Sequence, residues 1–329
     1  MKLPHRRKFL HLAAGAAALP ALPHIARAQA YPTRPINIII PFPPGGNSEG
    51  IVRFLAERLA LSLGQPVVVE HRPGGAGGSV GAKSVATAAP DGHILLLSSP
   101  GPLVVAPKVY KNLGYDPAKD FTPIGTLMSI SQMLVVNPAL PVKSIQELVA
   151  YAKANPGKLS FPSPGYGTQP HLLGEMFKLM AGVEILHVPY RGPAPAITDL
   201  LAGQVQIYFE SIGLMIPHVE AGKLKALAVA DEARDPQLPN VPTTIESGFP
   251  QLQATFWLGI LAPAGIPPII VNKLNTEINT IMKTKEAEAI LAKLSARPKV
   301  GSPADFAGFM VAETEKWAAV VQAANIKAE

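Results

Sequence analysis

A strand pattern, a loop rich in proline and glycine, and a helix pattern follow one another near the start of this chain and constrain its fold most. Residues 36–40 are mostly isoleucine, which is typical of a short strand buried on both faces. Apolar residues then return at helical spacing over residues 51–59. Asn47 or Ser48, at the end of the loop between them, can cap this helix and leave its first amides free to bind an anion.

The loop over residues 41–49 is therefore a candidate binding cradle. Its prolines stiffen the approach, and its glycine pair allows a ligand to touch the backbone. This combination suits a carboxylate or phosphate held without a charged side chain, and the alternative is a plain strand-to-helix turn. The candidate ligand-binding residues here are Phe42, Pro43, Pro44, Gly45, Gly46, Asn47 and Glu49.

A second unit of the same kind follows in the middle of the chain. Residues 159–161 have a strand pattern, residues 162–168 form another loop rich in proline and glycine, and residues 172–180 have a helix pattern. Two such units facing each other would clamp one ligand. The candidates here are Gly165, Tyr166, Gly167 and Thr168, with His171 on the helix.

His171 stands four residues before Glu175, so the two could lie on one helix face as a metal pair. A third ligand is not evident, and we therefore prefer a histidine that orients the Thr168 loop or caps its helix. No metal and no cofactor is expected.

Four further candidates lie elsewhere in the chain, three of them at the ends of strand patterns. Ser98 and Ser99 end the strand pattern of residues 94–97 and either face the same crevice or only cap the next turn. Tyr190 could supply a wall for an apolar ligand body. Glu210 follows a strand pattern at residues 205–209 and could, like Glu49, tune which carboxylates fit. The alternatives are that Glu49 only favours the positive end of its helix and that Glu210 bonds nearby amides.

The first thirty residues have the features of an export signal. Arg6 and Arg7 form a twin-arginine start, a mildly apolar segment follows, and residues 28–30 fit a small-x-small cleavage site. We therefore expect a periplasmic protein with residues 1–30 removed. Prolines at 20 and 23 argue against a retained membrane anchor.

Charge and composition restrict the function further. The formal net charge of +6 comes largely from the leader, because five of the 29 basic residues precede residue 31, leaving 24 against 23 acidic residues. A nucleic-acid-binding body is therefore not expected. The chain has no cysteine, so it has neither a disulfide framework nor a cysteine nucleophile.

The order of the patterns predicts two α/β domains. Strand and helix patterns alternate, restart after residues 133–136, and return through an apolar segment at residues 256–261. We expect one domain from residues 31–130 plus 257–329 and a second, inserted domain from residues 131–256.

Several motifs together resemble the Bug-type substrate-binding proteins of tripartite tricarboxylate transporters. They are residues 41–46, 65–70, 72–74, 89–92, 120–121, 170–172, 187–190 and 222–224. The resemblance implies a type II periplasmic binding protein whose two domains close like a flytrap on a small organic carboxylate. Backbone amides, hydroxyls and ordered water would grip the ligand, and membrane subunits would accept it; a monomer is expected.

This sequence departs from the family pattern at three places. Glu49 and Glu210 stand where the family usually carries aspartate, and residues 100–102 (Pro-Gly-Pro) replace a threonine-rich continuation. Each departure can reshape the pocket, so the resemblance does not identify the ligand.

An enzyme and a sensor are the alternatives to a transport receptor. The chain lacks the His-Glu-x-x-His motif of zinc proteases, and we expect no enzyme. A periplasmic carboxylate-sensing partner of a signalling system would use the same cleft. Arg191 is a cationic candidate that follows the second loop in sequence, and we expect it on the surface.

Overall fold

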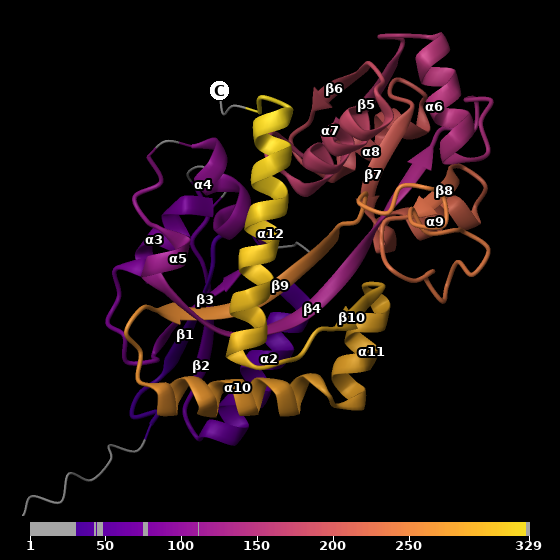
Figure 1. Cartoon of the computed structure of the whole chain (residues 1–329). Helices are drawn as coiled ribbons and strands as arrows, with labels where there is room; N and C mark the ends of the chain where they lie inside the picture. Colours follow the sequence, from indigo (N-terminus) through magenta and orange to yellow (C-terminus); the bar gives the residue numbers. More distant parts are fainter. Residues whose placement is uncertain (1–30, 43, 45–48, 75–77, 111, 327–329) are drawn as a thin grey trace, which may run out of the picture.

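A computed structural model of the protein describes residues 31–326, except residues 43, 45–48, 75–77 and 111. The first part of the chain forms β1 (Ile36–Ile40), α2 (Glu49–Leu63), β2 (Val67–His71), α3 (Ser79–Ala86), β3 (Ile94–Ser98), the π-helical turn η2 (Gly101–Val105), α4 (Ala106–Val109), α5 (Pro117–Asp120) and β4 (Phe121–Val136). These elements run from indigo to magenta in Figure 1.

The middle of the chain forms α6 (Ile145–Ala154), β5 (Leu159–Ser163), α7 (Gln169–Ala181), β6 (Ile185–Pro189), α8 (Pro193–Leu201), β7 (Ile207–Ser211), α9 (Ile212–Glu220) and β8 (Lys225–Val229). The last part forms β9 (Thr255–Pro263), α10 (Pro268–Met282), α11 (Lys285–Lys293), β10 (Ala296–Pro298) and α12 (Pro303–Ala323).

One large mixed sheet organises the molecule. Its strands lie in the order β10-β4-β9-β3-β1-β2, and both β7 and β8 also pair with β4. β1 is parallel to β2 and to β3, as expected for buried strands connected through helices. β5 and β6 form a separate two-stranded parallel sheet.

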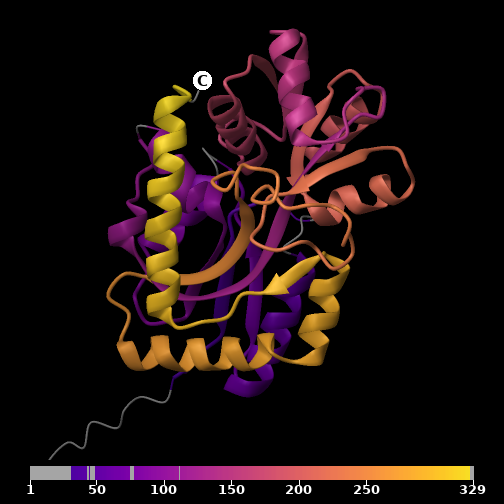
Figure 2. The same cartoon turned by 45° about the vertical axis from the view of Figure 1, so that its right-hand side comes forward.

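β4 and β9 cross the centre of the molecule side by side (Figures 1 and 2). Residues 121–131 of β4 pair with β9, and residues 132–136 pair with β7, so one strand of 16 residues belongs to both parts of the sheet. α12 lies along this crossing and contacts β4, α4 and α7. The first and middle parts of the chain are thus joined by continuous strands and by a packed helix.

The two faces of the sheet each carry an apolar core. Because side chains alternate along a strand, Ile38 enters one core and its neighbour Ile39 enters the other. On β7, Tyr208 and Phe209 are divided between the same two cores in the same way. Each core therefore contains residues from both the first and the middle part of the chain.

The strands predicted from the sequence are present, but some elements were missed. The pattern at residues 133–136 is only the end of β4, because polar and small residues such as Thr122 and Ser129 interrupt the apolar run before it. β6, α9 and β10 were not predicted. The expected domain boundaries at residues 131 and 257 fall inside β4 and β9, and the division into 31–130 plus 257–329 and 131–256 stays an interpretation.

Candidate ligand-binding site

A cavity of about 490 Å³ lies beside the ends of β3 and β7 and the middle of β4. Both the first and the middle part of the chain contribute to its walls. It is lined by Pro41, Phe42, Pro73, Gly74, Gly78, Ser99, Pro100, Gly101, Val105, Ala106, Tyr110, Gln132, Pro164, Tyr166, Gly167, Thr168, Gln169, Pro170, Pro193, Glu210, Ser211, Leu214 and Phe256.

The walls of the cavity are mainly aromatic and aliphatic. Phe42 and Tyr110 come from the first part of the chain, Tyr166 from the middle part, and Phe256 from β9. Among the described lining residues none is Lys, Arg or His, and Glu210 is the single carboxylate. Such a cavity suits a molecule with an apolar body and few polar groups.

Hydrogen bonds within the loop before α7 fix its shape. The Gly165 amide donates to Ser163 Oγ (3.2 Å), and Thr168 Oγ1 donates to the Gly165 carbonyl (2.7 Å). Thr168 is the N-cap of α7, yet its side chain makes no capping hydrogen bond to the helix. The first turn of α7 therefore presents its positive end to the cavity wall formed by residues 167–170.

Two stacked histidines support this loop from behind. His171, on α7, accepts a hydrogen bond from the Gly167 amide at Nδ1 (3.0 Å), and its ring stacks on His187 with centroids 3.9 Å apart. Burial, with a contribution from Lys178, lowers the pKa of His171 to about 4. Burial, together with the charges of His171 and Lys178, lowers the pKa of His187 to about 3. Both imidazoles are therefore neutral at neutral pH.

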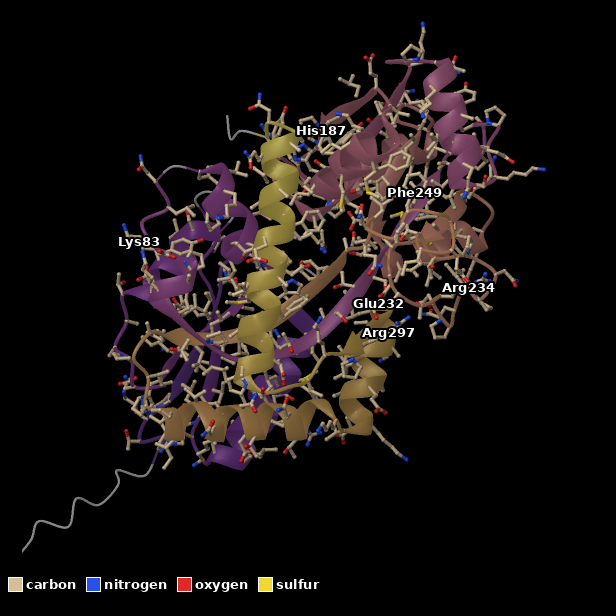
Figure 3. The ribbon with its side chains drawn as sticks, viewed as in Figure 1. Lys83, His187, Glu232, Arg234, Phe249 and Arg297 are labelled. Atoms are coloured by element: carbon tan, nitrogen blue, oxygen red, sulfur yellow. The ribbon has the colours of Figure 1, made fainter. Side chains whose placement is uncertain are left out.

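The second histidine holds the loop through Ser163. His187 Nε2 lies 2.7 Å from Ser163 Oγ, which also donates to the Gly165 carbonyl (2.9 Å). Figure 3 shows His187 beside the C-terminal end of α12, at the end of the molecule away from α10 and α11. The two histidines thus position the backbone of the loop from β6 and α7.

Polar groups gather at the cavity wall where β4 and β7 pair. Glu210 is buried, and its carboxylate accepts hydrogen bonds from the Tyr208 hydroxyl and the Ser211 amide, each at 2.7 Å. Burial raises the pKa of the Glu210 carboxyl, and the hydrogen bonds from Ser211 and Tyr208 oppose that rise. Gln132, opposite Ser211 in the β4–β7 register, donates from Nε2 to Ser211 Oγ (3.3 Å).

The match to a known family extends over most of this chain. The model for the "Tripartite tricarboxylate transporter family receptor" (TctC) matches residues 51–326. Protein BugT of Bordetella pertussis is 39% identical over 301 residues, which is 91% of this chain and 92% of BugT. The chain belongs to this receptor family.

Two solved structures of similar proteins carry ligands. Rpa4515 of R. palustris, with adipate, is 35% identical with a TM-score of 0.79, over 90% of this chain and 99% of that protein. MatC of Rhodopseudomonas palustris, with bound malate, is 33% identical with a TM-score of 0.75, over 88% and 100%. These likenesses confirm the α/β periplasmic binding protein fold and place the chain among solute-binding proteins, not enzymes.

Six of the residues predicted for this receptor's site line the cavity: Phe42, Ser99, Tyr166, Gly167, Thr168 and Glu210. Pro43, Gly45, Gly46 and Asn47 lie outside the described residues, and Pro44 is exposed. Gly165 and His171 stand behind the lining and shape the loop.

Three other predicted residues lie away from the lining. Ser98 is fully buried. The Tyr190 hydroxyl donates to Asp199 (2.7 Å), and the Glu49 carboxylate contacts Arg53 (2.6 Å) and His71 (3.0 Å). Glu49 thus has side-chain partners on α2 and β2, and its role in ligand choice stays a prediction.

Several lining residues were missed from the sequence. Gln132 stood beside an apolar strand pattern without any motif, and Gln169 followed the predicted loop by one position. Only the pairing of β4 with β7 brings Gln132 to Glu210 and Ser211. The predicted metal alternative at His171 has a competing contact, because Glu175 pairs with Lys178 (2.8 Å). No group of three or more acidic or histidine side chains suited to a metal occurs within the described part of the chain.

Across the described helices, none has both the length and the hydropathy that a membrane span requires.

Proposed function

We propose that this receptor binds a small organic carboxylate in the cavity and delivers it to the membrane subunits of a tripartite tricarboxylate-type transporter. The observation that carries the proposal is the cavity between the two strand-loop-helix units, with the first turn of α7 in its wall. Rpa4515 and MatC, with adipate and malate, support a carboxylate as the ligand class. The family description supports delivery to a transporter.

The ligand carboxylate would be held by neutral groups. The first turn of α7 would supply hydrogen-bond donors and a partial positive charge, because the Gly167 and Thr168 amides before it already donate within the loop. Arg191 is exposed and does not line the cavity. An apolar ligand body would then pack against Phe42 and Phe256.

Export to the periplasm completes the proposal. The twin-arginine start and the cleavage pattern of residues 1–30 support it, and the receptor is expected to act as a monomer.

Thermal unfolding with a panel of mono-, di- and tricarboxylates tests the binding function. A ligand that binds only the folded receptor should stabilise it by about 2.7 kcal/mol at a hundredfold excess over its Kd. Matched amines and sugars without a carboxylate serve as controls and should give no shift. Stabilisation by one of these controls, with none by any carboxylate, would contradict the proposal.

A further inference from the structure

Two glutamine side chains in the cavity wall have carbonyl oxygens without a hydrogen-bond donor. Gln132 is 1% exposed and Gln169 is 7% exposed, and Oε1 of each is buried with no partner among the described residues. Both residues line the cavity. A buried acceptor without a donor is unfavourable, so a donor brought by a ligand would improve the energy of this wall.

The orientation of Gln169 is fixed by its other contact. Its Nε2 donates to the Thr255 carbonyl at 2.7 Å, and a carbonyl oxygen can only accept. The amide therefore cannot be turned over without losing this bond. Its Oε1 is buried and remains without a donor among the described residues.

The orientation of Gln132 follows from a chain of hydrogen bonds. Its Nε2 donates to Ser211 Oγ, and the Ser211 side chain in turn bonds the Glu210 carboxyl. The Ser211 hydroxyl proton is thus used by Glu210, so Ser211 accepts from Gln132. The backbone amide of Gln132 donates to the Ala254 carbonyl, and the Gln169 side chain donates to the carbonyl of the next residue, Thr255. The two glutamines therefore bond neighbouring residues of one segment.

The wall formed by Gln132, Gln169 and Glu210 therefore consists of acceptors. No cationic side chain of the described residues forms an ion pair with Glu210, and none lines the cavity. A second ionised carboxylate placed here would meet two amide oxygens and a glutamate. An ammonium or hydroxyl group would instead donate to them.

We propose that the receptor prefers carboxylates that carry a second group able to donate hydrogen bonds, an ammonium or a hydroxyl, over dicarboxylates of the same length. This inference rests on the proposed function and names the ligand class of the same cavity. The ligand carboxylate binds near α7, and the donor group binds Gln132 and Gln169. The ammonium form also places a positive charge near Glu210.

Calorimetry with two matched series of acids tests this preference. One series is hexanoate, 6-hydroxyhexanoate, 6-aminohexanoate and adipate; the other is butanoate, 4-hydroxybutanoate, 4-aminobutanoate and succinate. In at least one series the amino or hydroxy acid should bind about tenfold or more tightly than both the unsubstituted acid and the diacid. Equal or tighter binding of the diacids or the unsubstituted acids in both series would overturn the inference and leave the proposed function intact.

Failure of both series to bind would overturn the inference as well, and the wider carboxylate panel then decides the proposed function separately. Equal affinities within both series would mean that water supplies the donors to both glutamines, which also overturns it.

Replacing a glutamine by methionine removes the acceptor at similar length. Gln132→Met should weaken binding of the preferred amino or hydroxy acid about tenfold while changing that of the unsubstituted acid less than about twofold. Gln169→Met should act in the same direction and serves if Gln132→Met does not fold. Gln146→Met, at an exposed position of α6, is the matched control and should bind like the wild type. Unchanged preference in both cavity variants would overturn the inference.

Discussion

His171 and His187 hold the shape of the loop before α7 through contacts that depend on their protonation state. A neutral imidazole can accept the Gly167 amide, whereas a protonated one has no acceptor to offer at Nδ1. Burial lowers the pKa of both rings, to about 4 and about 3, so the loop keeps its support at neutral pH. The same two rings should make the stability of the receptor depend on pH.

Stability should fall as the pH drops from about 6.5 toward about 4. Unfolded histidines have a pKa near 6.5, so in this interval the unfolded chain binds protons that the folded chain does not. The contribution of the two histidines is therefore complete above about pH 6.5 and is lost progressively below it. Urea unfolding at a series of pH values measures this slope.

Two variants separate this effect from general acid sensitivity. His171→Gln removes one of the two groups and should make the slope shallower between about pH 6.5 and pH 4. His218→Gln changes a partly buried histidine on α9 and should keep the wild-type slope. If all three proteins show the same slope, the buried histidines are not its cause.

Arg191 tests whether the ligand is held by neutral groups. It is exposed and absent from the cavity lining, so Arg191→Ala should weaken binding of the best carboxylate by less than about 1 kcal/mol. Calorimetry measures the change. A loss of several kcal/mol would mean that this guanidinium pairs with the ligand after the cavity closes.

The residues of the site differ in how readily the sequence reveals them. Tyr166, Gly167 and Thr168 lie in a loop whose glycines and position before a helix indicate a binding loop by themselves. Gln132 carries no such signal, because its neighbours are set by the register of β4 against β7, which are far apart in sequence. Local patterns therefore predict loops well and predict the side chains brought in by long-range pairing poorly.

At the scale of elements, β9 and α12 meet at a position without a side chain. A Cβ added at Gly259 would lie 2.3 Å from the Phe306 ring, which is 1% exposed. Phe306 in turn contacts the Trp257 ring edge-on. Glycine at this point of β9 lets the aromatic side chains of α12 pack directly on the strand.

Gly259→Ala should lower the free energy of unfolding by about 1–3 kcal/mol, because the new methyl group must displace Phe306 or the strand. Urea unfolding measures the loss. Gly50→Ala is the matched control: among the described residues, no atom beyond its chain neighbours and the backbone of α2 lies within 4 Å of its added Cβ, so it should be neutral or stabilise by up to about 1 kcal/mol. Equal effects of the two variants would contradict the packing argument.

The elements also show where periodicity was informative. β1 is apolar except for Asn37, its isoleucines pack in the two cores with residues of α2 and α3, and its pattern predicted it with its bounds. β4 was predicted at only one end, because residues 121–131 include threonine, proline, glycine and serine. Those residues form a strand through their pairing with β9, and this pairing is not visible in a local window.

At the scale of the whole molecule, the two parts of the receptor share their cores. One core contains Ile38 of β1 together with Tyr208 of β7, and the other contains Ile39 together with Phe209. β4 pairs with β7 of the middle part of the chain and with β9 of the last part. α12 packs against α4 of the first part and α7 of the middle part. Loss of one part would therefore expose apolar surface of the other.

The receptor should consequently unfold in a single transition, although larger chains with two domains often do not. The two tryptophans, Trp257 and Trp317, are buried in the last part of the chain, whereas Ile207 lies in β7 of the middle part. Ile207→Val should lower stability by about 0.5–1.5 kcal/mol and should shift the tryptophan fluorescence transition as much as the circular dichroism transition. Ile38→Val, in β1, is the matched control and should shift both signals equally as well. A fluorescence midpoint that stays at its wild-type value in Ile207→Val, while the circular dichroism midpoint moves, would mean that the two parts unfold independently.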